Sequence, residues 1–94
     1  MPQAIHNEAE LVTLYAEQIA SAAERIKMPE LEEILSNAVA DFGRTEGVSQ
    51  TEALRALAER LVQMSAKATP AAAKVFAAAK EMALHKIQDP GDLL

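Results

Sequence analysis

Four apolar stripes with helical spacing run along this chain, separated by short segments that contain residues typical of helix ends. The first stripe repeats at steps of three and four residues and consists of Val12, Tyr15, Ile19, Ala22 and Ile26. This step places side chains on one face of an α-helix, and the stripe is too long for a β-strand. It predicts a helix over residues 8–27, begun by a capping box of Asn7 and Glu10.

A second helix is expected over residues 29–42. Pro29 suits the first turn of a helix, where the amide hydrogen that proline lacks would have no partner. Glutamates follow it in the first turn, where the positive end of the helix dipole stabilises negative charge. Gly43 is placed to end this helix in a left-handed conformation, and residues 43–48 form the most evident loop.

Two further helices follow from equally local signals. Ser49 begins a capping box and predicts a helix over residues 49–66. Thr69 followed by Pro70 repeats the order of cap and proline, and it predicts an alanine-rich helix over residues 70–88.

These segments account for most of the 94 residues, so we expect one all-α domain over residues 1–94, with residues 1–6 and 89–94 as mobile ends. The short connections favour antiparallel neighbours. They predict a small four-helix bundle or a dimer of helical hairpins that complete their core on association. A chain so short and so rich in alanine buries little apolar area, and we therefore expect a homo-oligomer.

The composition argues against several kinds of function. Cysteine is absent, so disulfides and thiolate chemistry are excluded. The chain has neither an apolar run of membrane-spanning length nor a secretory signal, and a cytoplasmic location without membrane contact is expected. A net charge of −5 and an aromatic content of 3% make nucleic acid a less expected partner than protein.

Charge is distributed unevenly along the chain. Residues 1–64 carry five basic and eleven acidic side chains, whereas residues 65–88 carry four lysines and one glutamate. We expect a basic last helix beside an acidic body to form ion pairs, either within one chain or between subunits.

No constellation of residues predicts catalysis or metal binding. Glu81 and His85 are four residues apart, but a ferritin-like metal site needs a Glu-x-x-His step in each of two helices. The serines have no nucleophile-elbow context, and no glycine-rich phosphate loop is present. We therefore expect neither an enzyme nor a bound cofactor or metal ion.

The apolar side of the last helix is the first candidate for an interaction surface. It consists of Val75, Phe76, Ala79, Met82 and Ala83. This face either binds a partner or completes the core of the chain itself. The leading hypothesis is a small, non-catalytic helical module that binds itself or another protein and acts as a regulator, an adaptor or an assembly subunit.

A DNA-binding regulator is the alternative hypothesis. The helices expected over residues 29–42 and 49–66 are joined by a glycine-containing loop, as in a helix-turn-helix unit. Side chains near the start of the second of these helices would then face the base edges, and they are Gln50, Thr51 and Arg55. The acidic balance of the chain opposes this hypothesis.

Two short segments loosely resemble ribbon-helix-helix repressors and antitoxins. The segment RIKMP, residues 25–29, is similar to their strand, and the segment GVSQTEALRALAERL is similar to their second helix. The resemblance covers about residues 25–61 and implies a two-chain ribbon in which Arg25 and Lys27 face the major groove of DNA. The stretch between these two segments is about one helical turn longer than the family pattern.

Overall fold

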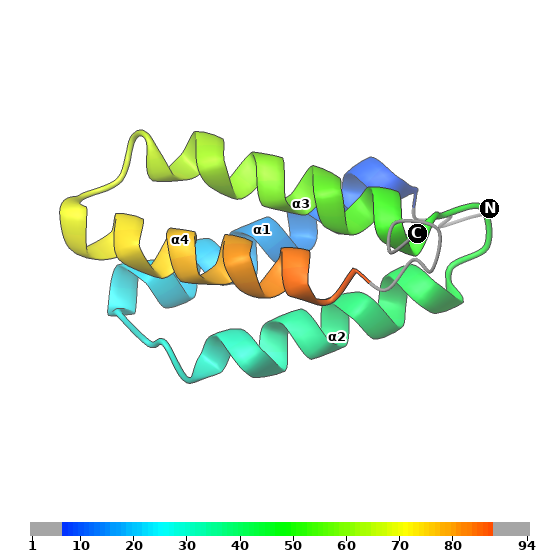
Figure 1. The fold of residues 1–94 in the computed structure, drawn as a ribbon, viewed down its shortest axis with the longest axis horizontal. Helices are drawn as coiled ribbons and strands as arrows, with labels where there is room; N and C mark the ends of the chain where they lie inside the picture. The colour runs from blue at the N-terminus through cyan, green and yellow to red at the C-terminus, as the bar shows by residue number, and fades with distance from the viewer. Residues whose placement is uncertain (1–6, 88–94) are drawn as a thin grey trace, which may run out of the picture.

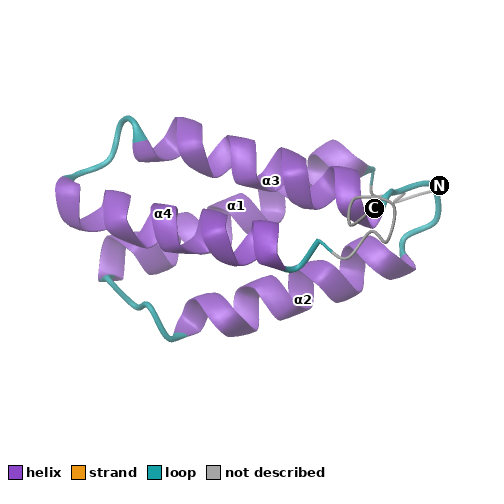
Figure 2. Cartoon of the chain, viewed as in Figure 1, coloured by secondary structure: helices purple, strands orange, loops and turns teal. Residues whose placement is uncertain are grey.

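The computed structural model describes residues 7–87, which contain α-helices and no β-strand (Figure 2). The helices are α1 (Glu8–Arg25), α2 (Glu30–Arg44), α3 (Gln50–Ser65) and α4 (Pro70–His85). Each helix runs antiparallel to the one before it, so the chain passes back and forth along one bundle (Figure 1). The expected four-helix bundle is confirmed, whereas the ends that we expect to be mobile, 1–6 and 89–94, lie outside the described residues.

Three of the four helices begin at the caps expected from the sequence. The Asn7 side chain accepts a hydrogen bond from the Glu10 amide at 2.8 Å, and the Glu10 side chain accepts one from the Asn7 amide at 3.4 Å. The hydroxyl groups of Ser49 and Thr69 each accept a hydrogen bond from the amide three residues later, at 3.3 and 3.2 Å. These bonds satisfy amides that have no partner inside the helix. In contrast, Pro29 precedes α2 and does not belong to its first turn.

The C-terminal helix ends differ from the expected positions by up to three residues. α1 ends at Arg25 and not at residue 27, because Ile26 adopts a left-handed conformation with φ 54° and ψ 46°. The Lys27 amide then donates to the Ala22 carbonyl at 2.9 Å, which closes the helix end. α4 ends at His85 and not at residue 88.

Gly43 does not end α2, contrary to the expectation. The helix continues through Gly43 to Arg44, and the left-handed φ, of 84°, belongs to Gly47 in the loop. A Cβ atom at Gly43 would lie 2.8 Å from Nε2 of Gln50, so the missing side chain leaves room for this amide. Nε2 of the Gln50 side chain donates a hydrogen bond to the Val39 carbonyl at 2.9 Å, and this bond joins the end of α2 to the start of α3.

The core lies between the four helices of a single chain. Each helix contacts the other three, and the contact between α3 and α4 is the most extensive. The largest fully buried side chains come from all four helices and are Ile19, Leu31, Leu35, Phe42, Leu54, Leu57, Leu61 and Val75. One chain therefore closes its own core, without a second hairpin. None of the helices in residues 7–87 has the length and apolar character needed to cross a membrane.

An ion pair fixes the end of α4 against α2. Nζ of Lys86 lies 3.2 Å from Oε2 of Glu32. A basic residue of the last segment thus pairs with the acidic body within the same chain, which is one of the two expected arrangements.

Candidate functional site

The α4 face expected to bind a partner lies inside the bundle. Val75, Ala79 and Ala83 are at most 1% exposed, and Phe76 is 5% exposed. Met82 is partly buried and packs against the core. These side chains complete the core of the chain, which is the second of the two interpretations given above. A surface that is open to a partner has to lie elsewhere.

The residues expected to contact DNA belong to a bundle hairpin and not to a helix-turn-helix unit. α2 and α3 run antiparallel along the bundle (Figure 1), whereas the helices of a helix-turn-helix cross at about 90–120°. The Gln50 amide is engaged with the Val39 carbonyl. Thr51 is half-buried, and Arg55 is exposed on the outer face of α3.

Residues 25–28 form the end of α1 and a turn, and not a strand. Nη2 of Arg25 lies 2.8 Å from Oε1 of Glu30, which holds this arginine against the start of α2. Lys27 is exposed in the turn. These residues do not form the ribbon that the resemblance to ribbon-helix-helix proteins implies, because the left-handed Ile26 directs the chain immediately into α2.

A polar network joins α1 to α2. The Tyr15 hydroxyl donates to a carboxylate oxygen of Asp41, which also pairs with Arg44. The ring of Tyr15 packs edge-on against Phe42 with 5.9 Å between the ring centroids. Burial, together with the hydrogen bond to Asp41 and its negative charge, raises the pKa of Tyr15 to about 12. This phenol stays protonated at neutral pH and acts as a fixed hydrogen-bond donor between the two helices.

Metal-ligating side chains are not gathered in the described part of the chain. Within residues 7–87, no three histidine, aspartate or glutamate side chains lie close enough together to hold a metal ion. Glu81 is one of the two residues weighed as metal ligands from the sequence, and its Oε2 lies 3.4 Å from Nζ of Lys80.

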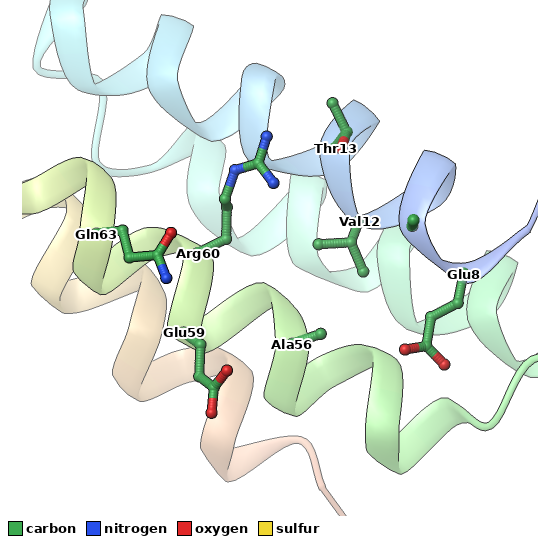
Figure 3. A pocket seen from close by; sticks show the side chains of 8 residues that line it. Glu8, Val12, Thr13, Ala56, Glu59, Arg60 and Gln63 are labelled. Atoms are coloured by element: carbon green, nitrogen blue, oxygen red, sulfur yellow. The ribbon is translucent and has the colours of Figure 1, made fainter.

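A groove of about 260 Å³ lies between α1 and α3 (Figure 3). Its charged lining residues include Glu8, Glu59 and Arg60. Figure 3 shows the two carboxylates well apart, on either side of Ala56, and the guanidinium of Arg60 pointing toward α1. General acid–base catalysis needs groups that converge on one substrate, and the charged groups of this groove diverge.

Two large apolar side chains are exposed together on the outer face of α3 and α4. Val62 is 52% exposed and Leu84 is 42% exposed. With Ala58 they line a groove of about 260 Å³, and a second groove of about 200 Å³ shares Val62 and continues past Ala77. We call the surface formed by Ala58, Val62, Ala77 and Leu84 the α3–α4 strip.

Two more exposed apolar side chains lie at the end of the bundle where α1 ends and α4 begins (Figure 1). Ile26 is 50% exposed and Met28 is 46% exposed. Ile26 lines two hollows, of about 370 and 480 Å³, whose other walls come from α1, from the turn before α2 and from α4 with the loop before it. We call the apolar lining of these hollows the end patch: Ile26, Met28, Pro70 and Ala71 are exposed, and the buried Ala72 and Phe76 lie beneath them.

Sequence reasoning placed Ile26 in the core stripe and gave no role to Val62 or Leu84. Val62 and Leu84 fall outside the apolar stripes of their helices, so helix periodicity could have placed them toward solvent. Ile26 has no comparable signal, because its spacing continues the stripe of α1. Only the left-handed backbone turns this side chain outward.

No protein-family model matches the chain, and no curated protein or solved structure is significantly similar to it.

Proposed function

We propose that this protein is a small, non-catalytic helical module that forms a homodimer through the α3–α4 strip and acts as a regulator, an adaptor or an assembly subunit. The observation that carries the proposal is that Val62 and Leu84 line one groove while each is about half exposed. Single apolar side chains on a surface need no explanation, but two that share a groove leave apolar area for a partner helix to cover. We place this module in the cytoplasm, consistent with its cysteine-free sequence.

The charges around the strip favour a second copy of this chain as the partner. Arg55 and Lys80 line the groove together with Glu59, so both signs of charge border the apolar residues. Around a border that carries both signs, a two-fold axis can place acidic groups of one subunit beside basic groups of the other. The two alanines of the strip leave room beside Val62 for side chains of the partner.

Sedimentation equilibrium of the full chain tests the proposal. We expect the mass to rise from 10.1 kDa toward twice that value as the protein concentration increases. Val62→Asp places a carboxylate in the middle of the strip. Because an unpaired carboxylate is costly to bury, we expect this variant to weaken dimerisation at least about tenfold.

Leu14→Asp is the matched control for Val62→Asp. Leu14 is 43% exposed on α1 and lines neither groove of the strip. This variant should dimerise as the wild type does, and circular dichroism should show that both variants keep their helices. A wild-type chain that remains at 10.1 kDa at every concentration, or a dimer that survives Val62→Asp, would overturn the proposal.

A further inference from the structure

The end patch is a second apolar surface, separate from the α3–α4 strip and formed by segments far apart in the sequence. Ile26 and Met28 follow α1, whereas the exposed Pro70 and Ala71 belong to α4. Figure 1 shows the last turn of α1 and the first turn of α4 at the same end of the bundle. The two hollows that share Ile26 are each within the size range of binding sites in proteins, at about 370 and 480 Å³.

Ile26 is held in a conformation that does not suit it. Its φ of 54° lies in the left-handed region, where the Cβ atom of an L residue approaches the following carbonyl oxygen. Glycine is the usual residue at such a helix end, and a β-branched residue is an outlier there. The side chain is also 50% exposed, so the strained backbone is not explained by burial in the core. The hydrogen bond from the Lys27 amide to the Ala22 carbonyl holds this conformation, and it leaves the Ile26 side chain exposed for a contact outside the chain.

The border of the end patch is basic, although the chain has a net charge of −5. Lys67 lines one hollow and Lys74 the other, and Lys27 is exposed between Ile26 and Met28. Within residues 7–87, no carboxylate is in ion-pair contact with any of these three lysines.

Few acidic side chains lie at this border. Glu24 lines one hollow. Glu30, at the start of α2, is already paired with Arg25 at 2.8 Å. The first turn of α4 contains no acidic residue, so the positive end of its dipole adds to the field of the lysines.

We propose that the end patch binds an acidic amphipathic helix of a partner protein. Bulky apolar side chains on one face of that helix would enter the two hollows on either side of Ile26, and its flanking carboxylates would lie near Lys67 and Lys74. A second copy of this chain, docked end to end about a two-fold axis, would instead bring lysines against lysines. A surface hollowed in two places also suits side chains better than it suits a flat lipid layer. This site goes beyond the proposed dimer, because it lies on another surface and takes a different partner.

The probe is a synthetic peptide of about 16 residues, helical by design, with leucine and phenylalanine at helical spacing and glutamate elsewhere. The matched peptide keeps the apolar positions and replaces each glutamate with lysine. Titration of the ¹⁵N-labelled full chain with the acidic peptide should shift the amide resonances of residues 20–28 and 67–76. The lysine peptide should bind at least about tenfold more weakly, and added salt should weaken the binding of the acidic peptide.

Two variants test the site by its chemistry. Lys67→Glu combined with Lys74→Glu should weaken binding of the acidic peptide at least about tenfold and strengthen binding of the lysine peptide. Simple loss of structure would not strengthen either interaction. Ile26→Gly keeps the backbone conformation and removes the side chain between the hollows, and it should weaken both peptides. Val62→Asp, on the α3–α4 strip, should bind the acidic peptide as the wild type does.

Three results would overturn the inference. One is an acidic peptide that shifts no resonances, or only those of the α3–α4 strip. Another is equal binding of the two peptides. The third is that vesicles containing phosphatidylserine, but not the peptide, perturb residues 20–28 and 67–76, which would identify a membrane-binding surface. Because peptide binding is measured on the Val62→Asp variant as well, the failure of this site and the failure of the dimer are distinguishable.

Discussion

At the residue scale, Tyr15 is the side chain whose ionisation is coupled to the fold. It is 4% exposed, donates to Asp41 and packs against Phe42, so it connects α1 to α2 by both a polar and an apolar contact. The apolar stripe of the sequence placed Tyr15 on the inner face of a helix, as the structure confirms. The partner could not be predicted in the same way, because Asp41 lies 26 residues away and the pairing depends on how two helices are aligned.

Tyr15→Phe should lower the free energy of unfolding by about 1–2 kcal/mol at pH 7. The variant keeps the ring and removes the hydroxyl, which leaves the half-buried Asp41 without this donor. Urea unfolding followed by circular dichroism measures the change. Tyr15→Leu, which also removes the edge-on contact with Phe42, should cost more. A Phe variant as stable as the wild type would show that the hydrogen bond contributes nothing.

The same residue predicts a loss of stability at alkaline pH. The pKa of Tyr15 rises from 10.0 in the unfolded chain to about 12 in the folded chain, so the folded state holds this proton more tightly. The contribution of Tyr15 is therefore complete below pH 10 and disappears as the pH rises toward 12. Over that interval the wild type should lose about 2–3 kcal/mol more than Tyr15→Phe. Parallel stability curves for the two proteins would contradict this assignment.

At the element scale, the sequence was a better guide to helix starts than to helix ends. Asn7, Ser49 and Thr69 are caps whose side chains bond to amides of their own helix, so the signal is local and the structure confirms it. Within residues 7–87, the sequence offered a specific end signal only at Gly43, and the other C-terminal ends were expected where the apolar spacing stops. The ends of α1 and α2 differ from the expected positions because Ile26 takes the left-handed position and Gly43 remains helical.

The contact between α2 and α3 at Gly43 is testable with a double-mutant cycle. Gly43→Ala adds a favoured helical residue, worth about 1 kcal/mol, but its Cβ would lie 2.8 Å from Nε2 of Gln50. Displacing this amide breaks the bond to Val39, so we expect the single substitution to be nearly neutral. In a Gln50→Ala background, Gly43→Ala should stabilise the chain by about 1 kcal/mol. Equal effects in the two backgrounds, measured by urea unfolding, would mean that the two residues do not interact.

At the scale of the whole molecule, the surfaces that matter come from how the helices are assembled. The all-α class and the bundle were predictable, because periodicity and short loops leave few other arrangements. The end patch was not, because it brings residues 26–28 together with residues 70–76 only when α1 and α4 meet at one end. The α4 face was ambiguous for a related reason. Its apolar pattern is the same whether it faces the core or a partner, and only packing distinguishes the two.

Ile26 occupies a left-handed position that is unfavourable for an isoleucine, and the hydrogen bonds that close α1 hold it there. Thermal unfolding of Ile26→Gly and Ile26→Ala tests this claim most directly, because both variants remove the exposed side chain beyond Cβ and only alanine keeps the strain. In an ordinary helical position glycine is the less stable by about 1 kcal/mol. At a left-handed residue 26 we predict the reverse, with glycine more stable by about 1 kcal/mol and its unfolding midpoint higher by roughly 4–8 °C. A midpoint for Ile26→Ala equal to or above that of Ile26→Gly would contradict the claim.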